Sequence, residues 1–99
     1  MTFVFHDTNG TPAGKLADCE MHFTDGPLAG LKLIGFSIWE SRSRGRNVTF
    51  PARQYSVNGE RRSFALLRPI EDHSAQNAIR DAMLEAYAQY ETAIAQANA

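Results

Sequence analysis

Alternation of apolar and polar side chains is the clearest pattern in the first half of the chain. From Ala17 to Phe23 every second residue is apolar, and Asp18, Glu20 and His22 lie between them. A period of two residues predicts a half-buried β-strand. A short β-prone run at Thr2–Phe5 precedes it, separated by Asn-Gly and Pro-Ala-Gly turn signals. The pattern therefore predicts two strands joined by a turn-rich connection.

The segment Leu31–Trp39 is almost continuously apolar, and its length and its β-branched and aromatic content favour a central strand over a helix. In a regular strand, Ile34, Phe36 and Ile38 share one face, and Leu33 and Trp39 share the other. A strand that is apolar on both faces needs cover on both. The run therefore indicates self-association of the chain.

Shorter elements are predicted downstream of this strand. A polar, arginine-rich loop at residues 40–46 leads into a strand at residues 47–50, which Pro51 ends or leaves at a sheet edge. The pair Asn58-Gly59 favours a tight hairpin turn, and residues 61–67 return as the partner strand.

The last quarter of the chain has a helical period. Asp72 or Ser74 is the predicted N-cap, and the helix is expected from Ala75 to about Ala95. Its apolar stripe follows steps of three and four residues and consists of Ile79, Met83, Tyr87, Tyr90 and Ile94. The predicted fold class is α+β: a small antiparallel sheet of four to five strands followed by one C-terminal helix.

Length and composition add few constraints. The 99 residues fit one domain, and 43% apolar with 21% charged residues is typical of a folded protein. The single cysteine, Cys19, excludes an internal disulfide and is expected to be a buried, inert thiol rather than a reactive one. The N-terminus lacks the features of a signal peptide, and no run has the length of a membrane span. We expect a cytoplasmic protein with no membrane partner.

The charge is distributed unevenly. The segment from Arg42 to Arg68 contains seven arginines and one acid, Glu60, so its formal charge is +6, while that of the whole chain is −1. Arginine is suited to phosphate because its planar fork contacts the anion bidentately, and interleaved aromatic residues can stack on bases. The candidate contacts in this segment are Arg42, Arg44, Arg46, Arg53, Tyr55, Arg61 and Arg62. The simpler alternative is a solvated hairpin whose cations maintain solubility.

The candidates differ in their expected geometry. The loop arginines lie beside Gly45, where the backbone can approach a phosphate. Arg61 and Arg62 are expected on opposite faces, so one of them faces a given ligand. Tyr55 is the stacking candidate because Phe50 and Phe64 alternate with polar residues as core positions do, and Arg68 is expected to pair locally with Glu71.

No residues have the spacing of a catalytic or metal site. The serines lack a nucleophile-elbow setting, and no glycine run precedes a helix as a phosphate loop requires. The histidines are scattered at positions 6, 22 and 73; Asp18 and Glu20 share a strand face with His22, an arrangement that is more often solvated than metal-binding. We therefore expect no enzymatic activity, no metal and no cofactor.

Five short strings follow one another along the chain: Gly35-Phe36-Ser37-Ile38-Trp39-Glu40, Val48-Thr49-Phe50-Pro51-Ala52-Arg53, Asn58-Gly59-Glu60, Pro69-Ile70 and Ala82-Met83-Leu84-Glu85-Ala86-Tyr87. In this order, and over roughly residues 15–90, the chain resembles the SpoVG family, the stage V sporulation protein G group of bacterial septation regulators. The resemblance implies one SpoVG-like domain over residues 1–99, a homodimer, no enzymatic activity and direct binding of DNA or RNA in gene regulation. Family helices begin with basic residues, whereas here the start at residues 71–77 is acidic and polar and Arg80 is the first cation, which we add to the candidate contacts.

Two functions are compatible with these patterns. The first is a nucleic-acid-binding regulator that uses the arginine-rich loop and hairpin. The alternative is a non-enzymatic protein-interaction module whose basic face binds an acidic protein partner.

Overall fold

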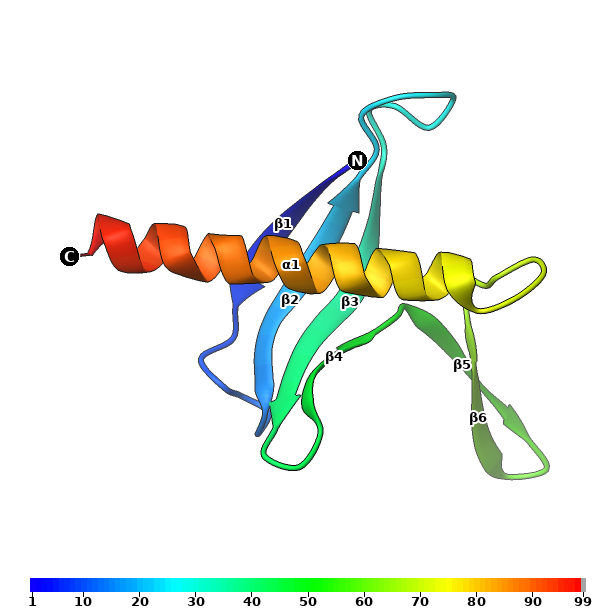
Figure 1. Ribbon diagram of the computed structural model, residues 1–99. Helices are drawn as coiled ribbons and strands as arrows, with labels where there is room; N and C mark the ends of the chain where they lie inside the picture. The colour runs from blue at the N-terminus through cyan, green and yellow to red at the C-terminus, as the bar shows by residue number, and fades with distance from the viewer. Residues whose placement is uncertain (99) are drawn as a thin grey trace.

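The protein is an α+β fold, described by a computed structural model over residues 1–98 (Figure 1). It consists of a four-stranded antiparallel sheet, a separate two-stranded hairpin and one C-terminal helix. The elements are β1 (Thr2–Asp7), β2 (Lys15–His22), β3 (Lys32–Ser41), β4 (Gly45–Thr49), β5 (Ala52–Val57), β6 (Glu60–Ala65) and α1 (Ser74–Ala97). The predicted class, strands and helix are therefore confirmed. No helix within the described residues is long and apolar enough to cross a membrane.

The main sheet follows chain order, β1-β2-β3-β4, and α1 lies across one of its faces (Figure 1). The period of two in β2 is confirmed, since its alternate side chains point to the helix and are buried. The buried core consists of Ala17, Cys19, Met21, Phe36, Ile38, Val48, Met83 and Tyr87. Cys19 is a free thiol with 1% exposure, and burial raises its pKa to about 12, as an inert core cysteine requires.

A β-bulge in β3 reverses the alternation of its side chains, so residues before and after the bulge point to faces that a regular strand would not give them. Cys19 and Met21 of β2 pair with Phe36 and Leu33, so three steps of β3 match two of β2. Leu33 consequently packs against the core, while Ile34 is 61% exposed on the face away from the helix. The predicted grouping of Ile34 with Phe36, and of Leu33 with Trp39, was wrong for this reason.

Gly35 makes the bulge possible. Its φ of +105° is a conformation that side chains disfavour, and a Cβ there would lie 2.9 Å from the Cβ of Pro51. Pro51 is buried and follows β4, so the chain leaves the sheet directly over the bulge. This close approach ends the ladder of the main sheet and directs β5 away from it.

Within residues 1–98 the β5–β6 hairpin pairs only with itself. It projects from the sheet on the side where α1 begins (Figure 1). Its turn at Asn58-Gly59 has positive φ at both residues, as a two-residue hairpin turn requires. Phe64, expected in the core, is 41% exposed because no other strand covers the hairpin, whereas Phe50 packs on Phe36 with ring centroids 5.2 Å apart.

The helical stripe is confirmed where the sheet lies beneath it. Met83 and Tyr87 are buried and Ile79 and Tyr90 pack at the edge of the core, but Ile94 is 40% exposed because the helix continues past β1 (Figure 1). The N-cap of α1 is His73, which makes no side-chain capping hydrogen bond, so the predicted N-cap at Asp72 or Ser74 was wrong. The carboxylate of Asp72 accepts the N–H of Ser74 at 2.9 Å just before the helix.

The chain is more extended than its size requires. Its radius of gyration is 15.2 Å, compared with about 13 Å for a compact domain of this length. It exposes 7256 Å², which is about 1,600 Å² more than a folded monomer of 11.0 kDa usually does. The projecting hairpin and the long helix account for this shape.

Candidate nucleic-acid interface

The turn between β3 and β4 is shorter than the sequence predicted. Strand pairing continues through Glu40 with Arg46 and Ser41 with Gly45, so only residues 42–44 form the turn. Gly45 adopts a φ of +70°, and the N–H of Arg44 donates to Ser41 Oγ at 3.0 Å. The expected loop at residues 40–46 is therefore a tight, internally bonded turn rather than a flexible segment.

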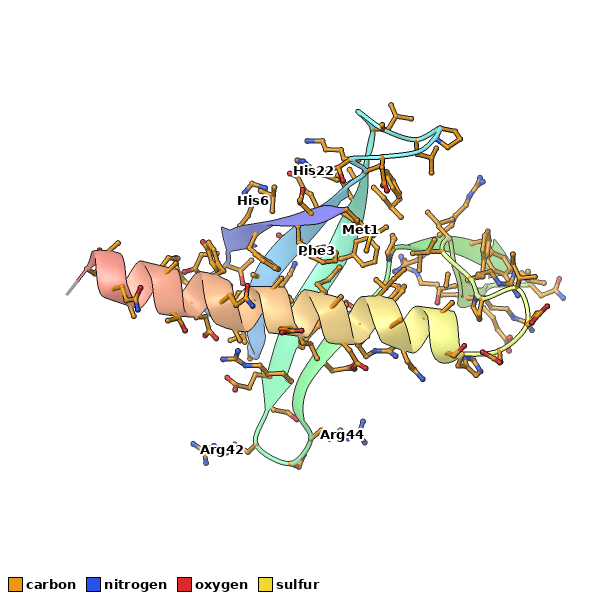
Figure 2. The ribbon with its side chains drawn as sticks, turned by 45° about the horizontal axis from the view of Figure 1, so that its top comes forward. Met1, Phe3, His6, His22, Arg42 and Arg44 are labelled. Atoms are coloured by element: carbon orange, nitrogen blue, oxygen red, sulfur yellow. The ribbon has the colours of Figure 1, made fainter. Side chains whose placement is uncertain are left out.

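Arg42 and Arg44 project from this turn into solvent. Figure 2 shows their side chains pointing to opposite sides of the turn and away from the sheet. Both residues are exposed, and neither forms a salt bridge within residues 1–98. The two guanidinium groups are thus available to an external anion. We refer to them as the turn arginines.

Arg46 is engaged inside the protein. Its Nη1 and Nη2 donate to the two carboxylate oxygens of Glu91 at 2.5 and 2.9 Å, and its Nε donates to Glu40 at 3.3 Å. The guanidinium also lies 5.3 Å from the ring centroid of Tyr87. The hydrogen bonds that Arg46 donates to Glu91 raise the pKa of Arg46. Arg46 therefore ties β4 to the helix, and sequence spacing alone had grouped it with the turn arginines.

The register of the hairpin collects arginines and aromatic residues on one face. Arg53 lies opposite Phe64 and Tyr55 lies opposite Arg62, and directly opposed residues of an antiparallel pair point to the same side. The rings of Tyr55 and Phe64 are 5.7 Å apart. We call these four residues the hairpin face. Arg61 pairs with Ser56 and lies on the opposite side, as predicted.

The hairpin face is exposed and weakly paired. Tyr55 is 40% exposed, and the one salt bridge on this face within residues 1–98 joins Arg62 to Glu60 at 3.2 Å. An ion pair between side chains that are more than half exposed contributes little. A phosphate can therefore compete for Arg62, and Arg53 forms no salt bridge in the described part of the chain.

The remaining two arginines belong to other surroundings. Arg68 was predicted to pair with Glu71, but the two side chains form no salt bridge. Arg68 instead borders a small apolar cleft beside Phe50. Arg80 is half-buried; its guanidinium lies 5.3 Å from the ring centroid of Phe50 and donates to Asn77 at 2.7 Å. Its Nε is buried without a partner among the described residues. Arg80 is thus a residue of α1 that packs against Phe50.

The sheet face away from α1 carries a cluster of polar and charged side chains around Glu20. Glu20 accepts hydrogen bonds from His22, Lys32 and His6 at 2.9, 3.0 and 2.8 Å, and these bonds lower its pKa to about 2. Figure 2 shows His6 and His22 on the side of the sheet opposite to α1. The carboxylate of Asp18 forms a salt bridge with the ammonium of Lys15 at 2.7 Å, and this contact lowers the pKa of Asp18. Within residues 1–98 no three His, Cys, Asp or Glu side chains form a group suited to a metal ion.

The fold and its charges define a small α+β protein with two solvent-exposed arginine sites, one on a turn and one on a projecting hairpin. No protein-family model, curated protein or solved structure matches the chain.

Proposed function

We propose that this protein is a non-enzymatic, cytoplasmic nucleic-acid-binding regulator, a distant SpoVG-like homodimer that contacts DNA or RNA through the turn arginines and the hairpin face. The observation that carries the proposal is the hairpin face, where the register interleaves two arginines with two exposed aromatic rings. Aromatic rings stack on bases of any sequence, and neighbouring guanidinium groups neutralise the phosphates between them.

Charge supports this reading at the level of single residues. Arg42, Arg44 and Arg53 have no carboxylate partner within residues 1–98, so binding a phosphate costs no internal salt bridge. Arg46 and Arg80 are committed to Glu91 and Phe50, and we leave them out of the contact set. Arg61 lies on the opposite side of the hairpin and Arg68 borders the cleft beside Phe50, so four arginines per chain remain as phosphate contacts: Arg42, Arg44, Arg53 and Arg62.

Self-association is supported by the exposed area. A standard protein interface buries about 800 Å² per partner, and the chain exposes about 1,600 Å² beyond the value expected for its mass. An isolated two-stranded hairpin is marginally stable in water, so an additional contact stabilises it. A second copy of the chain would supply that contact and duplicate the arginine sites.

The hairpin face also suits a protein partner, because Tyr, Phe and Arg are enriched in interfaces. An acidic protein is therefore the second candidate ligand. It differs from nucleic acid in requiring no base stacking and in showing no polyelectrolyte salt dependence.

The test is a fluorescence anisotropy titration of labelled mixed-sequence single-stranded DNA, single-stranded RNA and duplex DNA across a salt series. Each chain that contacts the strand supplies four phosphate contacts, so log affinity is expected to fall with log salt with a slope of about −2.8 per chain on single strands and about −3.6 per chain on duplex. Replacing both turn arginines by alanine is expected to reduce the single-strand slope by about 1.4. Light scattering on the same samples is expected to give twice the 11.0 kDa chain mass.

Adjacent arginines provide a matched control. Arg62→Ala is expected to reduce the single-strand slope by about 0.7, while Arg61→Ala removes the same charge from the opposite side of the hairpin and leaves the slope within error. Absence of binding to all three nucleic acids at about 50 mM salt would overturn the proposal and favour the acidic protein partner. A monomeric mass would overturn the homodimer.

A further inference from the structure

The open face of the sheet carries an aromatic ring between a cation and an amide. Lys15 of β2 pairs with Trp39 of β3, and Trp39 pairs with Asn47 of β4, so the three side chains form a row on one face. Ile38 and Val48, their neighbours along the strands, are buried on the opposite face beneath α1. The row therefore lies on the side of the sheet that the helix leaves uncovered.

An open pocket of about 400 Å³ adjoins this row. Its wall includes Trp39, Asn47, Gly14, Gly45 and Arg44, so it extends from the sheet to one of the turn arginines. Pockets that hold small organic ligands have volumes of about 300–1,000 Å³. The pocket has room for one planar base with its sugar.

Trp39 is held in place independently of any ligand. Its indole N–H donates to Thr49 Oγ1 at 2.9 Å, and the N–H of Glu40 donates to the carbonyl of Gly14 at 2.8 Å. A Cβ on Gly14 would lie 2.9 Å from the carbonyl oxygen of Glu40, so a residue with a side chain at position 14 would push the start of β2 away from β3. Fixed walls lower the ordering cost of binding.

The chemistry of the wall matches a nucleotide. The ring of Trp39 already attracts the ammonium of Lys15, which lies 6.0 Å from its centroid. The side chain of Asn47 makes no hydrogen bond within residues 1–98, and its amide can donate to and accept from the edge of a base. Arg44 supplies a free cation, and the carboxylate of Glu40 is already paired with Arg46.

We propose that this pocket binds one unstacked base of single-stranded nucleic acid, with the base on Trp39, its edge on Asn47 and its phosphate on Arg44. The proposal rests on the proposed function and adds a preference for single strands over duplex. A base in a duplex is stacked on both sides and cannot lie on Trp39 without leaving the duplex. Lys15 is already paired with Asp18 at 2.7 Å, so Arg44 is the cation that contacts the phosphate.

The chain contains one tryptophan, so its intrinsic fluorescence reports directly on the pocket. We would titrate the full chain with single-stranded oligonucleotide, the matched duplex and inorganic polyphosphate. Emission is expected to fall with the single strand, in step with anisotropy, and to change little with duplex or polyphosphate. Asn47→Ala is expected to weaken single-strand binding about 5–10-fold, while Gln89→Ala, an exposed amide on α1, leaves it unchanged.

Two results would refute the pocket and leave the proposed function intact. One is anisotropy showing that the oligonucleotide binds while Trp39 emission stays constant and Asn47→Ala binds normally. The other is polyphosphate quenching the emission as strongly as the oligonucleotide, which would indicate an anion site without base contact. A complete absence of oligonucleotide binding would instead overturn the proposed function itself.

Discussion

Replacing Arg46 with methionine is expected to destabilise the fold while leaving the turn arginines free to bind. Arg46 forms a bidentate ion pair with Glu91 and lies over the ring of Tyr87, linking β4 to α1. Methionine keeps much of the apolar stem and removes the charge. The change therefore separates the structural role of this arginine from the phosphate role that sequence spacing predicted.

The expected loss of folding free energy depends on how exposed the Arg46–Glu91 ion pair is. The Arg46 and Glu91 side chains are 30% and 41% exposed, so we use the upper end of surface ion pairs, about 1 kcal/mol. The contact with Tyr87 adds about 0.5–1 kcal/mol. The expected loss is about 1.5–2 kcal/mol, which lowers Tm by about 6–16 °C in a domain of this size.

The assay is a double-mutant cycle by urea denaturation at one fixed protein concentration, since self-association makes stability concentration-dependent. Arg46→Met, Glu91→Gln and the double variant are expected to give a coupling energy of about 1 kcal/mol. Arg44→Met removes the same charge from the exposed turn and is expected to change stability by no more than about 0.5 kcal/mol. A coupling energy near zero would refute the structural role, as would Arg46→Met reducing the salt slope of nucleic-acid binding as much as Arg44→Met does.

Two further substitutions test other parts of the fold. The pKa of Glu20 falls from 4.5 to about 2 on folding, so its contribution is present above pH 4.5 and lost towards pH 2. Glu20→Gln should flatten the decline of Tm over that range, and Glu85→Gln should not; equal declines in both variants would contradict this. Gly35→Ala should cost about 2 kcal/mol or more in urea denaturation, because its Cβ meets Pro51, and Gly59→Ala, with positive φ but open space, should cost less.

The local parts of the fold were predictable because each is encoded in a few consecutive residues. The alternation in β2 reflects one face against the helix, and the Asn58-Gly59 turn reflects the positive φ that these two residues tolerate. The period of the helix placed Met83 and Tyr87 in the core. None of these features depends on a contact between distant parts of the chain.

The bulge in β3 was missed although a signal was present. A single extra residue exchanges the two faces of a strand, so alternation read across Gly35 assigned Ile34 to the wrong side. A glycine inside an apolar strand often marks a bulge or a close backbone approach, and here it marks both. The exposure of Phe64 was missed for a different reason: alternation predicts two faces but not whether anything covers them.

The candidate site was predicted by composition and corrected by geometry. Seven arginines within 27 residues indicated a basic surface, but the count could not show that Arg46 finds Glu91, 45 residues further along the chain. Nor could it show that Trp39 lies in a row with Lys15 and Asn47, because that row depends on the pairing register. Long-range pairing thus decides which charges remain free.

The distribution of the acids restricts where a polyanion can lie. Asp81 and Glu85 are exposed on α1, and Glu71 and Asp72 precede it, so the helix presents a negative surface. In the proposed complex, the carboxylates on the exposed side of α1 would repel a nucleic-acid strand, and the turn arginines would attract it. The proposed pocket lies on the sheet face that α1 leaves uncovered and shares Arg44 with the turn. If the proposed pocket is correct, repulsion by α1 and stacking on Trp39 would therefore favour the same face of the sheet for the bound strand.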